Sequence, residues 1–284
     1  GEEALKASAS SEALNYLQEA LKLYVDRYGE DTDPEKLTKF EKNIALAFYN
    51  KGQWPEAVEY FDMVLKRWGT PVPKTGAGGI ALSLWGFMVL LKVAYLKLPS
   101  SKKIPGSRDY EAFDFYYKAI EALSYIDHTR QFLAGLDLFR RTTQFDISKI
   151  PMVSMYWSGV AAILSVSGLS FRLGSWLLEI AQRYIDTEDV ASRMNNVVMS
   201  TITFHCQGVW DKIQDFDEYL MNAALRIGDL WQAANYLIFY GLVKGEQGEF
   251  GLLQKTIERT HAIGETYAYN LATLETRELE SELL

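Results

Sequence analysis

The sequence predicts an all-α protein, and three observations support this. Apolar residues recur in steps of three or four through almost every long segment, the spacing that places them on one face of a helix. Strand-type alternation of apolar and polar residues is hard to find. In addition, glycines lie forty residues apart, each between two helical patterns of a length suited to one antiparallel pair: Gly168, Gly208 and Gly248. A fixed period of this kind predicts repeated helical hairpins.

The helices are expected in the following order. A first helix covers about residues 11–28, and a helix pair covers 35–68. The apolar faces of this pair are Leu37, Phe40, Ile44 and Phe48, then Ala57, Phe61, Val64, Leu65 and Trp68. An apolar helix follows, and further pairs are expected at about 109–144, 150–185, 188–227 and 230–263, before a final helix.

The hairpin turns share a pattern in which an aromatic residue often follows glycine by two positions, as in GQWPEA (Gly52 to Ala57) and GVWDKI (Gly208 to Ile213). Glycine tolerates a positive φ at the end of a helix, so the chain can reverse there within a few residues. We therefore interpret Trp54 and Trp210 as residues that pack over a turn. In the same alignment the turns at Gly168 and Gly248 place Ser170 and Phe250 two residues after glycine. The residues five after the four glycines are Ala57, Leu173, Ile213 and Leu253.

One segment interrupts the repeats. Loops rich in proline, glycine and serine, at 69–79 and 98–107, flank an apolar stretch that begins at Ile80. Only about a dozen residues precede Lys92, fewer than the ~20 needed to span a bilayer. We expect a helix buried against neighbouring hairpins rather than inserted in lipid. The chain then has three parts: repeats at 1–68, this helix with its loops at 69–107, and longer hairpins at 108–284 that continue the first part.

The segment Asn43 to Leu65 resembles the tetratricopeptide repeat, in which small and aromatic residues recur at set places. Those places hold Ala45, Phe48, Gly52, Ala57, Phe61 and Val64. Residues 11–21 look like the second helix of a preceding repeat, with Ala13, Leu17 and Ala20. The resemblance implies a right-handed solenoid of antiparallel helix pairs. The later repeats are looser and longer, with Leu173 and Ile213 where the family prefers alanine.

The order of a repeat ending in LKRWGTPVP, an apolar helix and larger hairpins is similar to the C-terminal region of large bacterial signalling ATPases. Those proteins join an NTP-hydrolysing module, and often a nucleotide cyclase or protein kinase, to a helical repeat tail. No ATPase motif is present in this sequence, so the resemblance implies a regulatory tail within a larger signalling protein.

Composition narrows the partners and the compartment. A net charge of -8 without a long basic run argues against nucleic acid, because binding a polyanion requires clustered Lys and Arg. Cys206 is the only cysteine, so no intrachain disulfide is possible and a reducing, cytoplasmic location is expected. The first ten residues lack a basic stretch followed by an apolar core, so no signal peptide is expected.

No group of residues predicts a reaction or a metal site. In PKTGAGG (Pro73 to Gly79) the lysine, Lys74, precedes the glycines, the reverse of a phosphate-binding loop. The three histidines, His128, His205 and His261, fall in different hairpins without metal-ligand spacing. His205 and Cys206 are neighbours on a helix and point about 100° apart, which disfavours a thiol nucleophile. We expect no enzyme activity, no cofactor and no metal.

In tetratricopeptide arrays the first helix of each pair lines the concave groove. This implies a mostly apolar binding groove formed by Lys39, Lys42, Leu46, Tyr49, Asn50, Asn195, Val198, Ile202, His205, Asn235, Ile238 and Leu242. The family's clamp for a C-terminal carboxylate has lysine and then asparagine four residues on, whereas Lys42 is followed by Leu46. The expected function is a scaffold for a protein partner or another domain of the same polypeptide, without a membrane partner. Two alternatives stay open: a small-molecule sensor that binds its ligand in the groove, and an all-helical enzyme.

Overall fold

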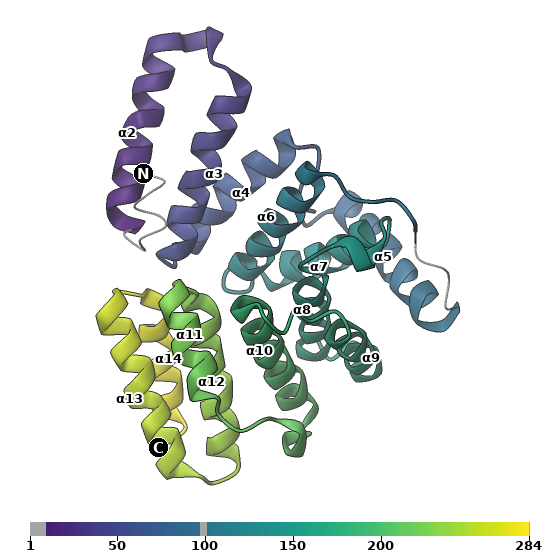
Figure 1. Ribbon diagram of the computed structural model, residues 1–284, viewed down its shortest axis with the longest axis vertical. Helices are drawn as coiled ribbons and strands as arrows, with labels where there is room; N and C mark the ends of the chain where they lie inside the picture. Colours follow the sequence, from purple (N-terminus) through teal and green to yellow (C-terminus); the bar gives the residue numbers. More distant parts are fainter. Residues whose placement is uncertain (1–9, 97–100, 284) are drawn as a thin grey trace. The chain divides into compact units, whose positions relative to one another are not determined.

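Helices form all the regular structure of residues 10–96 and 101–283, which are the residues that the computed structural model describes (Figure 1). No β-strand occurs in this part of the chain, so the all-α prediction is confirmed. The chain divides into two compact units: residues 1–84 with 105–138, and residues 85–104 with 139–284. We describe each unit separately.

The first unit contains α2 (Ser10–Tyr28), η1 (Gly29–Asp31), α3 (Pro34–Asn50), α4 (Trp54–Arg67), α6 (Ser107–Leu123) and most of α7 (His128–Thr142). The helix α3 packs against α2 and α4, and α4 also packs against α6. The core of this unit includes Phe61 and Phe115, whose ring centroids lie 4.5 Å apart in an edge-to-face contact. The start of α3 is fixed by Asp33, whose carboxylate accepts a hydrogen bond from the Glu35 amide at 2.9 Å.

The second unit contains η2 (Ile147–Lys149), α8 (Val153–Val166), α9 (Phe171–Gln182), α10 (Val190–Gln207), η3 (Trp210–Lys212), α11 (Glu218–Ile227), α12 (Leu230–Glu246), α13 (Phe250–Tyr267) and α14 (Asn270–Ser281). The helix α8 packs against α9 and α10, α10 packs against α12, and α12 packs against α13 and α14. The first helices of successive pairs are therefore neighbours. The predicted helix pairs match these elements to within a few residues, apart from the late start of α11.

The four turn glycines adopt the conformation that the sequence predicts. Their φ angles are 70° at Gly52, 65° at Gly168, 68° at Gly208 and 76° at Gly248. Each follows the end of a helix, where its amide bonds back to a carbonyl of the last turn. A side chain at such a position costs free energy, because residues with a Cβ rarely adopt the left-handed conformation.

Gly168→Ala is accordingly expected to lower the free energy of unfolding by about 1 kcal/mol. A Cβ at Gly168 would meet no atom within 4 Å, so the effect isolates the backbone conformation. Gly251→Ala is the matched control, since Gly251 also has open space but lies inside α13 without a positive φ. That variant should gain up to about 0.5 kcal/mol, because Gly251 is the second residue of α13 and the propensity gain of ~1 kcal/mol applies to helix interiors. Chemical denaturation measures both, and changes of the same sign would contradict this explanation.

The aromatic residues after the turns do not all behave alike. Trp54 is buried, stacks on Tyr125 at 5.2 Å and contacts the edge of Tyr49 at 5.5 Å. It thus packs at its turn as predicted. Phe250 instead is 55% exposed, so the packing role does not extend to the fourth turn.

The alignment on Gly208 is wrong beyond the turn. The short η3 helix follows, and α11 begins only at Glu218, after the Asp217 carboxylate caps the Leu220 amide at 2.8 Å. Ile213 therefore lies in a loop rather than on a helix, whereas Leu173 and Leu253 occupy buried helical positions. The longer connection between α10 and α11 explains why this helix pair departs from the repeat.

The expectation that the apolar helix is buried is also wrong. This helix, α5 (Ala77–Leu96), has 20 residues, long enough and apolar enough to cross a membrane, yet only 17% of its most apolar window is buried. It continues past Lys92, the residue at which the predicted apolar stretch ends. Because α5 is apolar on every side, its periodicity gives no information about which faces are covered.

Candidate functional site

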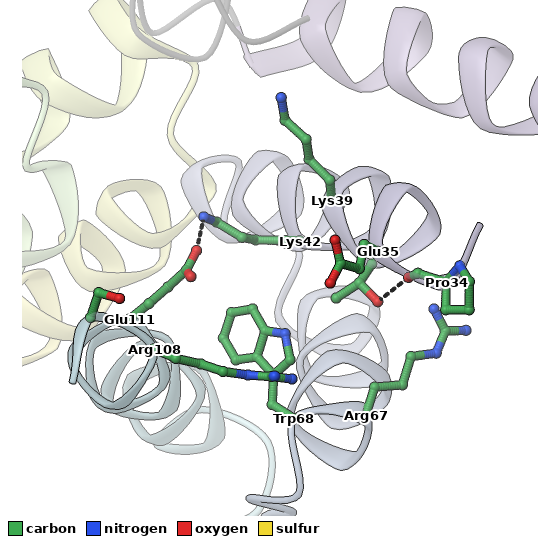
Figure 2. Close-up of a pocket in the computed structure, with 10 residues that line it drawn as sticks. Pro34, Glu35, Lys39, Lys42, Arg67, Trp68, Arg108 and Glu111 are labelled. Carbon is green, nitrogen blue, oxygen red and sulfur yellow. Dashed lines mark hydrogen bonds and ion pairs between the residues drawn. The ribbon is translucent and has the colours of Figure 1, made fainter. Parts of the chain in front are cut away.

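The first unit contains a pocket of about 720 Å³ between α3, the end of α4 and the start of α6 (Figure 2). Its lining residues come from segments that lie far apart in the sequence: Pro34, Glu35, Thr38, Lys39, Lys42, Arg67, Trp68, Ser107, Arg108 and Glu111. The volume falls in the range of small-ligand pockets, ~300–1,000 Å³. The pocket is therefore the candidate binding site.

An ion pair joins the two helices across the pocket. The Lys42 ammonium on α3 donates to the Glu111 carboxylate on α6, and Figure 2 shows the two side chains reaching toward each other. Both groups are partly exposed. A pair of this kind contributes little to stability, because water screens it. A ligand with a carboxylate or phosphate could therefore compete with Glu111 for Lys42 at low cost.

A second ion pair supports one wall of the pocket. Arg67 donates to both carboxylate oxygens of Glu41, at 2.6 and 3.0 Å. Burial raises the pKa of Glu41. The charge and hydrogen bonds of Arg67 lower it, but burial is the larger effect and the pKa lies above its usual value. The two-point contact fixes the guanidinium plane. Arg67 is thus held in place at the rim of the pocket.

The lining carries an excess of positive charge within an acidic protein. Four side chains are cationic and two are anionic: Lys39, Lys42, Arg67 and Arg108 against Glu35 and Glu111. The side chain of Arg108, at the second position of α6, has no hydrogen bond or ion pair with any described residue. Trp68 adds an aromatic surface, and its ring lies 5.5 Å from that of Phe115. This combination suits an anionic group attached to an apolar or aromatic one.

The structure brings together only two of the residues predicted to line the groove, Lys39 and Lys42. Leu46, His205 and Leu242 are half-buried, and Asn50 is exposed. The other six side chains are buried in the cores of the two units: Tyr49, Asn195, Val198, Ile202, Asn235 and Ile238. Three of them have internal partners: Tyr49 donates to Glu121 at 2.6 Å, Asn195 accepts from Ser158 at 2.9 Å, and Asn235 Nδ2 donates to the Trp231 carbonyl at 2.9 Å. These side chains present little surface to a ligand.

Arg67, Trp68, Arg108 and Glu111 were not predicted as site residues. Arg67 and Trp68 end one helix and Arg108 begins another, about forty residues later, with α5 between them. A sequence alone does not show that these two helix ends meet. The available signal was the clustering of basic residues at both helix ends.

His205 and Cys206 lie next to each other in the second unit, on α10. His205 Nε2 lies 3.2 Å from a carboxylate oxygen of Glu246, which lies on α12, the first helix of the following pair. Burial, and then the charge of Glu246, raise the pKa of the Cys206 thiol. A raised pKa lowers the thiolate fraction and hence the reactivity of the sulfur. Among residues 10–96 and 101–283, no three histidine, cysteine, aspartate or glutamate side chains lie together as a metal site would require.

Comparison of this chain with protein-family profiles, with curated proteins and with solved structures found no match. The site is therefore interpreted from its own geometry and chemistry.

Proposed function

We propose that this chain is a helical-repeat scaffold that binds an acidic segment of a protein partner, or of another domain of a larger signalling polypeptide, in the pocket of the first unit. The observation that carries the proposal is the cationic lining around Trp68, which has four basic side chains against two acidic ones. Arg67 is paired with Glu41 and Lys42 with Glu111, so the charge open to a partner comes chiefly from the Arg108 end of the pocket. An acidic peptide with an apolar or aromatic residue complements both features. The proposed role is non-enzymatic and cytoplasmic.

The architecture we propose for the scaffold is a tetratricopeptide-like right-handed array of helix pairs. Three features support it: the α3–α4 pair with buried Ala57 at its small-residue position, the glycine turns, and the contacts of α8 with α10 and of α10 with α12. Stacked pairs of this kind create extended surfaces for partners.

A second candidate function is a small-molecule sensor. The pocket volume of about 720 Å³ favours it, since a compact anionic ligand with an aromatic ring would fill a space of this size beside Trp68. Such a ligand should raise the midpoint of thermal unfolding of the isolated chain, whereas a scaffold without its partner shows no such response.

Arg108→Glu is expected to weaken capture of the protein partner by about tenfold, because it reverses a charge at the pocket rim. Arg172→Glu is the control. Arg172 is also exposed and also occupies the second position of its helix, α9, so the two variants change charge and helix propensity alike. Affinity purification from the source cells, followed by titration of the captured protein, measures the effect.

The proposal requires that Arg172→Glu bind as the unmodified protein does. Equal binding by all three proteins would place the contact elsewhere on the chain. Capture of a basic rather than an acidic segment would contradict the charge argument.

A further inference from the structure

The exposed face of α5 is an apolar surface without a described role. Its large side chains follow one another at helical spacing and are 53–64% exposed: Ile80, Leu84, Trp85, Met88, Tyr95 and Leu96. Soluble proteins rarely leave a contiguous apolar patch of this kind uncovered. Figure 1 shows α5 as one continuous helix. We therefore expect a binding partner to cover this face.

The charges along the same segment indicate which occupant. Residues 63–108 contain eight lysine and arginine residues and no aspartate or glutamate, in a chain whose net charge is -8. Among them Lys74, Lys92, Lys102 and Lys103 are exposed. The segment is thus strongly cationic on both sides of its apolar helix, whereas the remainder of the chain is strongly acidic.

A lipid bilayer accounts for an exposed apolar helix among lysines better than a protein partner does. The centres of protein interfaces are depleted of lysine. Helices that lie at a membrane surface combine lysine or arginine with apolar side chains and with tryptophan or tyrosine, as α5 combines Lys92 with Trp85 and Tyr95. An anionic bilayer also places negative headgroups directly beside hydrocarbon. A bilayer therefore supplies both the negative charge and the apolar surface that α5 and its lysines would contact.

The chain connections exclude a membrane-spanning arrangement of α5. Before it, Val72 is buried and the Pro73 carbonyl accepts from Arg130 of the first unit at 3.2 Å. After it, Pro105 leads into α6 of the same unit. If α5 crossed the ~30 Å hydrocarbon core, only the eight residues between Leu96 and Pro105, three of them lysines, would be left to bring the chain back through it, and even a fully extended chain of that length barely reaches across. The helix can only lie along the surface.

We propose that α5 binds the surface of an anionic lipid bilayer, with its exposed apolar face in the headgroup boundary and the flanking lysines against lipid phosphates and carboxylates. This binding is separate from the pocket function, and it departs from the expectation, based on burial of this helix, that no membrane is a partner.

Sedimentation of the full 284-residue chain with vesicles tests the proposal. The protein should bind vesicles of phosphatidylcholine with phosphatidylserine at least about tenfold more tightly than vesicles of phosphatidylcholine alone. Lys92→Gln and Lys102→Gln should each weaken this binding about fivefold, and added salt should weaken it further. Leu84→Glu should weaken it about tenfold or more.

Leu274→Glu is the matched control, because Leu274 on α14 is 60% exposed and Leu84 is 61% exposed. It adds the same charge to the protein and should leave vesicle binding unchanged. Both variants should keep the circular dichroism spectrum and melting temperature of the unmodified protein, since neither side chain is in a core. Equal binding to both vesicle types, no binding to either, or equal loss in both variants would overturn the proposal. A dimer that Leu84→Glu dissociates would overturn it too, because a second copy would then cover the face.

Discussion

Replacing Ala57 with leucine is expected to lower the free energy of unfolding by about 1–3 kcal/mol. Ala57 on α4 is completely buried, in the helix pair that most resembles a tetratricopeptide repeat. Three additional carbons would force α4 away from its neighbours, α3 and α6. Because each repeat contacts mainly the next one, hydrogen exchange should accelerate first in α3 and α4, while α8 to α14 keep their protection.

Ala262→Leu provides the control for that variant. Ala262 is exposed on α13, so the same change of volume meets no packed neighbour and should alter stability by less than about 0.5 kcal/mol. Loss of protection spread evenly over the whole chain in Ala57→Leu would show that the repeats are not separable. Unchanged protection everywhere would show that Ala57 does not lie at a close helix contact.

Glu275→Met is expected to stabilise the second unit by about 1–3 kcal/mol at neutral pH. Glu275 lies on α14 with only 5% of its surface exposed, and its Oε2 atom has no hydrogen-bond partner among the described residues. Burial, followed by the charge of Glu278, raises the pKa of Glu275 well above 4.5. Methionine has a similar length and needs no hydrogen bond, so it removes the cost of the buried carboxyl group.

The same pKa shift predicts the pH dependence. The folded protein holds the Glu275 proton more tightly than the unfolded chain does, so the folded state binds more protons above the unfolded pKa of 4.5. Stability should therefore fall as the pH rises from about 4.5 toward the raised pKa of the folded state, and Glu275→Met should lack this decline. The gain from the substitution should be larger at pH 8 than at pH 5.

Glu280→Met on the same helix is the control, because Glu280 is exposed. Denaturant titrations at several pH values should show little change in that variant at any pH. Destabilisation by Glu275→Met at neutral pH would mean that the carboxylate has a favourable partner and would contradict its assignment as a cost to folding.

The helices could be predicted from sequence because their evidence is local. The spacing of Leu37, Phe40 and Ile44 indicates a helix regardless of what covers it, and the positive φ of Gly168 follows from its place after a helix. The extent of burial depends on distant segments. The apolar sequence of α5 fits both a core helix and an exposed one, and only the fold shows that Leu84 and Trp85 are uncovered.

The candidate site was predictable only in part for the same reason. Lys39 and Lys42 follow from the helical face of α3, and the structure places both in the pocket. Glu111, the partner of Lys42, and Arg108 come from α6, beyond the α5 segment. In α10, helical spacing did not distinguish a groove face from a core face, and Asn195 and Val198 proved to be completely buried.

Hydrogen exchange of the chain with and without its captured partner tests the central claim most directly. If the pocket of the first unit binds the partner, amides of Pro34–Asn50 and of Ser107–Leu123 should exchange more slowly in the complex, and Arg108→Glu should abolish this difference at the same partner concentration. Slower exchange confined to the helices of the second unit, or protection that Arg108→Glu leaves intact, would contradict the assignment of this pocket as the binding site.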